Sequence, residues 1–269
     1  MKHVLEMWDK IEMIMDGHNI VLGFDYDGTL SPIKDTPEQA ILTRENKQLL
    51  KKLTNCCTLA IVSGRALVDL KAKVNLPNII YVGNHGLEIS GPGINFESFV
   101  PIKEKKDLNC LRQILIAEYR LIKGVWVEDK GLSLSVHYRL AHESDELSIM
   151  RIFQKTCRRY EINRTIRVTL GKKVLEVRPN VDWDKGNALL WLLAKKRYSY
   201  GKVKIMPIFI GDDLTDEDAL GAIRGQGLGI VVGKKENSKA GYFLKDTQEV
   251  TEFMRRILVY LTVQSTTES

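Results

Sequence analysis

The sequence predicts an α/β protein in which a core with a parallel β-sheet carries a smaller α+β domain as an insertion. Short apolar runs near both ends of the chain alternate with helix-like segments and end in polar residues, a pattern typical of a parallel sheet. The middle of the chain alternates apolar and polar residues, which indicates antiparallel strands with one covered face. The chain has 269 residues, enough for one or two domains of about 150 residues each.

The composition is that of an ordinary globular protein. Apolar residues make up 44% and charged residues 28%, so a disordered chain and a disulfide scaffold are excluded. The net charge of +6 mildly favours anionic ligands. The lysine clusters are short, scattered and without interleaved aromatic residues, so we expect no nucleic-acid partner.

Cysteine usage and hydropathy indicate the compartment in which the protein is located. The four cysteines form no C-x-x-C pair, so we expect reduced thiols in a cytoplasmic protein. Charged residues interrupt the first 15 positions, unlike a signal peptide. No run of 18 apolar residues occurs, so we expect no membrane association.

The first part of the chain alternates helices and strands. Helical spacing from Val4 to Met15 indicates an amphipathic helix, and a second helix is expected from Thr43 through Leu53. Buried strands are expected at 20–24, 59–62 and 79–82. Ligands of parallel α/β sheets bind at the carboxyl ends of the strands, so the polar residues there are candidates for a site.

The pattern changes in the middle of the chain and returns after Pro179. The expected elements of the middle are helix 104–122, an alternating strand within 125–138, helix 143–160, and strands 165–170 and 173–178. The later ones are a helix from about 185, strands 205–210 and 228–232, and helix 248–263. We therefore expect a core of residues 1–102 and 182–269 and an inserted domain of residues 103–181.

Carboxylates follow two of the buried strands. Asp25 and Asp27 follow the first one, and a cluster from Asp212 to Asp218 follows the strand at 205–210. Isolated buried carboxylates are costly, so a cation is expected between them. Carboxylate oxygens from two strand ends are typical ligands of Mg²⁺. The alternative is that these aspartates are helix N-caps, an interpretation that suits one of them better than all four of Asp25, Asp27, Asp212 and Asp213.

Two further residues stand where a phosphate could be held. Ser63, at the end of strand 59–62, is either an N-cap or a phosphate ligand at a helix start, and the sequence alone does not decide between these. Lys185 follows Asp184 at the start of a predicted helix and means little by itself.

These elements, in this order, resemble the four motifs of the haloacid-dehalogenase-like phosphohydrolases. Asp25-Tyr26-Asp27-Gly28-Thr29 is similar to the first motif, Ser63 to the second, Lys185 to the third and Gly211-Asp212-Asp213 to the fourth. The resemblance implies a Rossmann-like core, Mg²⁺ and an aspartyl-phosphate intermediate. An insertion between the second and third motifs, such as the one predicted here, is in this family a cap domain over the active site.

The sequence resembles more specifically the trehalose-6-phosphate phosphatases, from about residue 20 to residue 235. The segments that carry this resemblance are 25–33, 83–88, 128–139, 171–179 and 211–218. Those within the insertion are the specific ones, because the core motifs belong to the whole superfamily. Many family members also carry a fused synthase domain, for which this chain has no room.

The resemblance implies roles for individual residues. Asp25 is implied as the nucleophile, Asp27 as the proton donor and acceptor, and Ser63 and Lys185 as partners of the phosphoryl group. The implied metal ligands are Asp25, the backbone carbonyl of Asp27, and Asp212. Asp213 and Asp216 are implied to orient these ligands and water without binding the metal themselves. The implied substrate-binding residues are Arg65, His85, Glu88, Glu128, His137, Arg139, Lys172, Glu176 and Arg178.

Several alternatives to this function stay open. On strand 173–178, Val174, Glu176 and Arg178 share a face that is either an ordinary solvated surface or a pocket for sugar hydroxyls. Another capped sugar-phosphate phosphatase, acting on sucrose 6-phosphate or mannosyl-3-phosphoglycerate, is the nearest rival. A sugar-phosphate sensor without activity is a second one, although all four motifs are intact. The expected state is a monomer with a small-molecule substrate.

Overall fold

The computed structural model describes residues 1–200 and 204–267, which form two compact units. The first unit contains residues 1–34 and 38–97 and the chain from Trp183 onward. The second contains residues 98–182 together with 35–37. Each unit has its own hydrophobic core, so the two are described separately.

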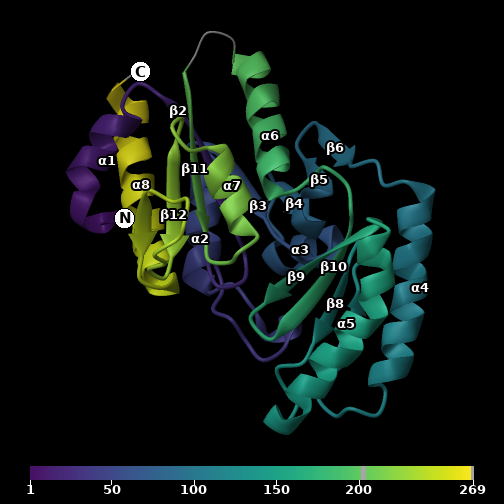
Figure 1. Cartoon of the computed structure of the whole chain (residues 1–269). Coiled ribbons are helices and arrows are strands. Elements are labelled where there is room, and N and C mark those ends of the chain that lie inside the picture. Colours follow the sequence, from purple (N-terminus) through teal and green to yellow (C-terminus); the bar gives the residue numbers. More distant parts are fainter. Residues whose placement is uncertain (201–203, 268–269) are drawn as a thin grey trace. The chain divides into compact units, whose positions relative to one another are not determined.

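The first unit is built on a sheet whose described strands follow the order β1-β13-β12-β11-β2-β3-β4-β5-β6 (Figure 1). Their bounds are β1 Lys2–His3, β2 Asn19–Phe24, β3 Thr58–Val62, β4 Ile80–Gly83, β5 Glu88–Gly91, β6 Ile94–Glu97, β11 Ile205–Gly211, β12 Leu228–Val232 and β13 Tyr242–Leu244. Pairing is parallel from β1 through β4 and antiparallel from β4 to β6. The expected parallel sheet is present, and β1, β5, β6 and β13 extend it.

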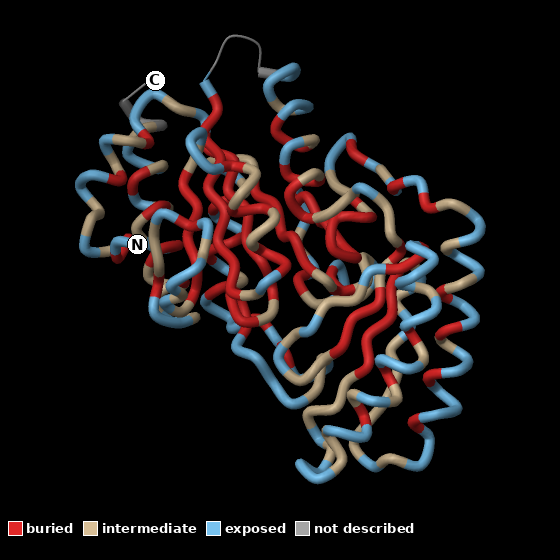
Figure 2. The backbone as a smooth tube through the Cα atoms, in the orientation of Figure 1, coloured by how far each residue is buried: buried red, intermediate tan, exposed pale blue. Residues whose placement is uncertain are grey.

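Helices cover both faces of this sheet. Alternate residues of the buried strands point to opposite faces, so Leu22 on β2 packs in one core and Val21 in the other. The core around Leu22 also receives residues of α1 Trp8–Met15, α2 Arg44–Leu53, α3 Leu67–Val74 and α8 Thr247–Thr267. The core around Val21 receives residues of α6 Lys185–Tyr200 and α7 Asp216–Ala222. Figure 2 shows the central strands as the most continuously buried part of this unit.

An aromatic contact joins the places where the chain leaves the first unit and returns to it. Phe96 lies on β6, the last strand before the second unit, and Trp183 is the first residue after it. Their ring centroids are 4.9 Å apart, and Phe96 lies 5.0 Å from the ring of Trp191 on α6. The two ends of the insertion are therefore held side by side by side chains of the first unit.

The second unit is an antiparallel sheet with helices on one face. Its strands follow the order β7-β8-β10-β9, with bounds β7 Trp126–Asp129, β8 Leu134–His137, β9 Ile166–Gly171 and β10 Val174–Pro179. Helices α4 Ile102–Tyr119 and α5 Glu146–Ile162 bury Leu111 and Phe153 against Val136 and Val177 of the sheet. The opposite face carries mostly polar side chains.

One predicted element of this unit is corrected by the structure. The segment 125–138 was expected as a strand pattern, and it forms a hairpin of β7 and β8. Gly131 has φ +81°, the left-handed region that favours glycine, and the amide of Lys130 donates to the carbonyl of Ser133 at 3.0 Å. Polar and apolar residues alternate along both strands of the hairpin, so the sequence pattern does not mark the turn between them.

The lengths and hydropathies of the helices within residues 1–200 and 204–267 bear on membrane insertion. None of the helices there is long and apolar enough to cross a membrane.

Candidate functional site

The carboxyl ends of the parallel strands bring the predicted core residues together. Asp25 follows β2 directly, and Asp212 follows β11, the neighbouring strand. Lys185 begins α6, and its ammonium lies 2.8 Å from Oδ1 of Asp25 and 2.7 Å from Oδ1 of Asp216. All four side chains are buried. Lysine and aspartate side chains from distant parts of the sequence thus share one buried site.

The buried carboxylates and the ammonium of Lys185 shift one another's pKa values. Burial raises the pKa of Asp25 well above its usual range, and the neighbouring carboxylates of Asp216 and Asp212 raise it further, against the ammonium of Lys185. Despite its burial, Lys185 has a pKa raised above its usual value by the carboxylates of Asp216 and Asp25. Lys185 contacts two of the three carboxylates, and the ammonium of Lys235 donates to the backbone carbonyl of Asp212. Among these groups the carboxylates outnumber the ammonium groups.

These carboxylates fit a divalent cation. Oxygen atoms of Asp25, Asp212 and Asp216 lie within 4.8 Å of one another. An all-oxygen set with excess negative charge suits Mg²⁺. Gly28, at φ +87°, lets the first-motif loop approach closely, because a Cβ there would lie 2.3 Å from the carboxylate of Asp212. Asp216, which was expected behind the ligands, belongs to this cluster.

Asp216 also holds the loop after β11. Its Oδ2 accepts hydrogen bonds from the amides of Asp212 at 2.9 Å and Asp213 at 2.8 Å. The residue before α7 is Thr215, whose side chain makes no capping hydrogen bond. The N-cap interpretation therefore does not account for this acidic cluster.

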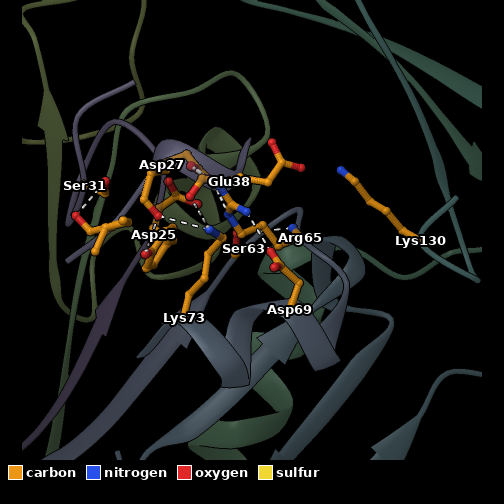
Figure 3. A network of polar contacts seen from close by, with 12 residues as sticks. Asp25, Asp27, Ser31, Glu38, Ser63, Arg65, Asp69, Lys73 and Lys130 are labelled. Carbon is orange, nitrogen blue, oxygen red and sulfur yellow. Dashed lines mark hydrogen bonds and ion pairs between the residues drawn. The ribbon is translucent and has the colours of Figure 1, made fainter. Parts of the chain in front are cut away.

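Asp27 points to a different partner. Arg65 holds its carboxylate through two hydrogen bonds of 2.7 Å, and a third bond of 2.6 Å joins Arg65 to Asp69 on α3 (Figure 3). Arg65 was expected among the substrate-binding residues, and Asp69 was not singled out from the sequence. A carboxylate four positions after an arginine at a helix start is a weak signal that could have found this pair.

Ser63 lies beside this network at the end of β3. Its Oγ accepts a hydrogen bond from the amide of Arg65 at 3.2 Å, and the side chain is buried. The residue before α3 is Ala66, and it provides no side-chain cap. Ser63 is therefore not the N-cap of this helix.

His85 lies in the segment after β4, and Glu88 is the first residue of β5. Asn84 and His85 both have positive φ, 48° and 57°, which is uncommon for residues other than glycine and is found at functional sites. The buried ring of His85 packs on Gly64, where a Cβ would lie 2.4 Å from it. Glu88 accepts a hydrogen bond from the side chain of Asn84. Both predicted residues belong to the first unit, and the amide of His85 donates to the backbone carbonyl of Ser63 at 3.0 Å.

The remaining predicted substrate-binding residues lie in the second unit. Strand register places Glu128, His137, Glu176 and Arg178 on the face of the sheet opposite α4 and α5. His137 Nε2 lies 2.7 Å from Oε2 of Glu128, and Arg178 donates to Thr169 at 3.0 Å. Glu176 is 8% exposed, whereas Arg167, which lies opposite Arg178 on β9, is exposed. We call this face of the sheet, which carries Glu128, His137, Glu176 and Arg178, the polar face.

Arg139 and Lys172 lie beyond the strand ends of the same unit. The guanidinium of Arg139 donates to the backbone carbonyl of Lys172, which sits in the turn between β9 and β10. Lys172 itself is exposed.

Two residues of the polar face were missed by sequence reasoning. The indole of Trp126 stacks on the ring of His137, with centroids 4.8 Å apart and planes at 13°. The ammonium of Lys130 lies 3.5 Å from Oε1 of Glu176. Trp126 could have been found from its spacing of two from Glu128, whereas Lys130 lies in the turn that the sequence did not reveal.

Comparison with known proteins gives concordant matches. A family model described as trehalose-phosphatase matches residues 23–248. Trehalose-phosphate phosphatase B of Arabidopsis thaliana is 36% identical over 270 residues, which cover 94% of this chain and 70% of that protein. Trehalose 6-phosphate phosphatase RA3 of Zea mays is 36% identical over 262 residues, covering 90% of this chain and 70% of that one.

Solved structures support the fold. The C-terminal domain of a trehalose-6-phosphate phosphatase from C. albicans superposes with a TM-score of 0.79 at 20% identity, covering 96% of this chain and 98% of that one. A trehalose-6-phosphate phosphatase related protein superposes with a TM-score of 0.71 at 25% identity, covering 91% and 99%.

Proposed function

Since this chain belongs to the trehalose-phosphatase family and is an enzyme that hydrolyses phosphate esters, we propose that it converts trehalose 6-phosphate to trehalose and phosphate through an aspartyl phosphate, with Mg²⁺. The observation that carries the mechanism is the buried contact of 2.8 Å between Asp25 and Lys185 at the end of β2. It puts a carboxylate beside a fixed positive charge where phosphate-binding sites of parallel sheets form.

Asp25 is the proposed nucleophile. Its carboxylate forms a bond to phosphorus while the bond from phosphorus to the sugar oxygen breaks, which gives the aspartyl phosphate. The reaction needs Asp25 ionised, whereas burial and two neighbouring carboxylates oppose its charge. Lys185 and a cation among the carboxylates would together restore the ionised form.

Asp27 is the proposed proton donor and acceptor. It gives a proton to the sugar oxygen as that oxygen leaves, and its carboxylate then takes a proton from the water that hydrolyses the aspartyl phosphate. This role is supported by its position two residues after Asp25, on the loop that contains Gly28 at positive φ.

The residues proposed to hold Mg²⁺ are Asp25, the backbone carbonyl of Asp27, and Asp212. When bound, Mg²⁺ would supply positive charge to the phosphoryl oxygens. Asp216 would orient the ligand loop through its bonds to the amides of Asp212 and Asp213, and it is itself close enough to be a ligand. Ser63 and Lys185 would bind the remaining phosphoryl oxygens.

We propose that the second unit is a cap domain that selects the sugar. A disaccharide has many hydroxyls, and each needs a donor or an acceptor once water is removed. The polar face offers both kinds, with Glu128 and Glu176 as acceptors and His137, Arg178 and Lys130 as donors. Arg139 and Lys172 are proposed to contact the same sugar.

The test is phosphate release from a panel of sugar phosphates, with and without Mg²⁺. We expect trehalose 6-phosphate to be hydrolysed with the highest kcat/KM and only with Mg²⁺. Preference for sucrose 6-phosphate or mannosyl-3-phosphoglycerate would overturn the substrate. Binding of trehalose 6-phosphate without any release of phosphate would identify a sensor and overturn the enzyme mechanism.

A further inference from the structure

Arg65 connects the carboxylate of Asp27 to that of Asp69. Its Nε and Nη2 donate to Oδ2 and Oδ1 of Asp27, each at 2.7 Å, and its Nη1 donates to Oδ2 of Asp69 at 2.6 Å. Figure 3 shows the guanidinium between the two carboxylates. A guanidinium is a rigid planar fork, so a paired bond of this kind fixes both the position and the plane of the carboxylate of Asp27.

The guanidinium is fixed on a third side as well. Its central carbon lies 5.1 Å from the centre of the ring of Tyr26, a cation–π contact. Tyr26 is fully buried, and its hydroxyl donates to the carbonyl of Ala40 at 3.0 Å. Arg65 itself is 6% exposed, whereas the side chains of Asp27 and Asp69 are 39% and 40% exposed. The most buried member thus joins two accessible carboxylates.

We propose that Asp69 and Arg65 are positioning residues for Asp27, with Asp69 anchoring the far end of the fork. This inference rests on the proposed role of Asp27 as proton donor and acceptor. It replaces the substrate-binding role that the family resemblance implies for Arg65. The bonds of Arg65 to the carboxylates of Asp27 and Asp69 support the new role.

The positioning matters most while the sugar leaves. As the bond from phosphorus to the sugar oxygen breaks and the bond to Asp25 forms, the proton of Asp27 must pass to that oxygen. A sugar alkoxide is a poor leaving group, so an ill-placed donor slows this step. A nitrophenolate leaves without a proton, so the same fault has little effect on 4-nitrophenyl phosphate.

The experiment measures release of the alcohol in a single turnover with enzyme in excess, which reports formation of the aspartyl phosphate. Asp69→Asn should slow the release of trehalose roughly tenfold, since misplacing a catalytic group by about 1 Å can cost about 10²-fold. KM should change little, and release of nitrophenolate should stay within about twofold of the wild-type rate if only proton donation is impaired. A positioning residue thus predicts a loss that depends on the leaving group.

Lys71→Gln is the matched control. Lys71 lies on the same helix, and its ammonium donates to the hydroxyl of Ser90 at 2.7 Å, on the surface of the same unit. This variant should release trehalose at the wild-type rate. A loss equal to that of Asp69→Asn would mean that any damage to α3 slows the reaction, which would overturn the proposal.

A double-mutant cycle with Asp27→Asn separates the two proposals. Asp27→Asn alone should slow trehalose release by about 10²–10⁴-fold. Adding Asp69→Asn should then change nothing more, because Asp69 acts through Asp27. If Asp69→Asn slows trehalose release by the same factor in the wild-type protein and in the Asp27→Asn variant, the positioning role is wrong. If Asp27→Asn alone does not slow trehalose release, the proposed role of Asp27 is wrong, and the positioning role of Asp69 and Arg65 is then wrong as well.

Arg65→Lys provides an independent measurement. A lysine keeps the charge and loses the fork, so kcat for trehalose 6-phosphate should fall while KM stays near the wild-type value. A raised KM with unchanged kcat would identify Arg65 as a sugar ligand and overturn the proposal.

Discussion

The ammonium of Lys185 lies 2.8 Å from the carboxylate of Asp25, although 160 positions separate the two residues along the chain. The contact joins the start of α6 to the end of β2, elements on either side of the second unit in the sequence. The proposed nucleophile and its charge partner are therefore both supplied by the first unit.

Removing the nucleophile should abolish turnover and preserve the fold. Asp25→Asn is nearly isosteric, but an amide does not form an acyl phosphate and carries no charge for the metal. Phosphate release should fall to background, and urea unfolding should still show a cooperative transition. Release at the wild-type rate by the folded variant would contradict the mechanism.

Removing the charge partner should cost stability as well as activity. Lys185→Met leaves the carboxylates of Asp25 and Asp216 buried without their ammonium, and breaking such a buried pair costs about 3–5 kcal/mol. Urea denaturation measures this loss. The control is Lys245→Met, which breaks an exposed pair with Glu249 and should cost about 0–1 kcal/mol. Equal losses in the two variants would mean that Lys185 is not a buried charge partner.

Magnesium should stabilise the folded protein through Asp212. At a concentration 100 times its Kd, a ligand of the native state adds about 2.7 kcal/mol to the free energy of unfolding. Asp212→Asn should lose most of this gain. Asp213→Asn removes the adjacent carboxylate, which lies outside the cluster of Asp25, Asp212 and Asp216, and should keep more of it. A full gain in the Asp212→Asn protein would contradict the proposed ligand set.

The polar face should determine substrate choice. Glu176→Ala should lower kcat/KM for trehalose 6-phosphate by about 5- to 150-fold, because each unpaired buried partner costs roughly 1–3 kcal/mol. Hydrolysis of 4-nitrophenyl phosphate should hardly change. Glu146→Ala, which breaks an ion pair with Lys173 in the same unit, should affect neither substrate. Equal loss with both substrates in Glu176→Ala would show that Glu176 is structural or catalytic.

The cysteines should differ in reactivity. Burial raises the pKa of Cys57 and of Cys157 to about 12 in each case, so almost no thiolate forms at pH 8. Cys110 is exposed. Iodoacetamide should therefore alkylate Cys110 first and Cys157 only after unfolding, as measured by peptide mass spectrometry. Equal rates for Cys110 and Cys157 in the folded protein would contradict the burial of Cys157.

The parts of the fold that the sequence predicts best are those with an abrupt change of polarity. Asp25 and Asp212 each follow a run of apolar residues, so their position at strand ends follows from composition alone. Strands β5, β6 and β13 are three or four residues long and lie at or near the edge of the sheet, where a short run carries little periodic signal.

Contacts between distant residues are harder to foresee. The spacing of Arg65 and Asp69 is a weak signal for their contact, but Arg65 and Asp27 are 38 positions apart, and neither motif indicates that the same arginine also holds Asp27. The packing of the guanidinium over the ring of Tyr26 is likewise seen only in the folded chain.

The contact of Phe96 with Trp183 bears on how such a protein can diversify. Because these two rings close the base of the insertion from within the first unit, the residues between them can change in length and sequence while the chain still exits and re-enters at one place. The base of the insertion is therefore a position at which one inserted domain can be replaced by another. One phosphoryl-transfer apparatus could receive inserts that recognise different alcohols without rebuilding the sheet beneath them.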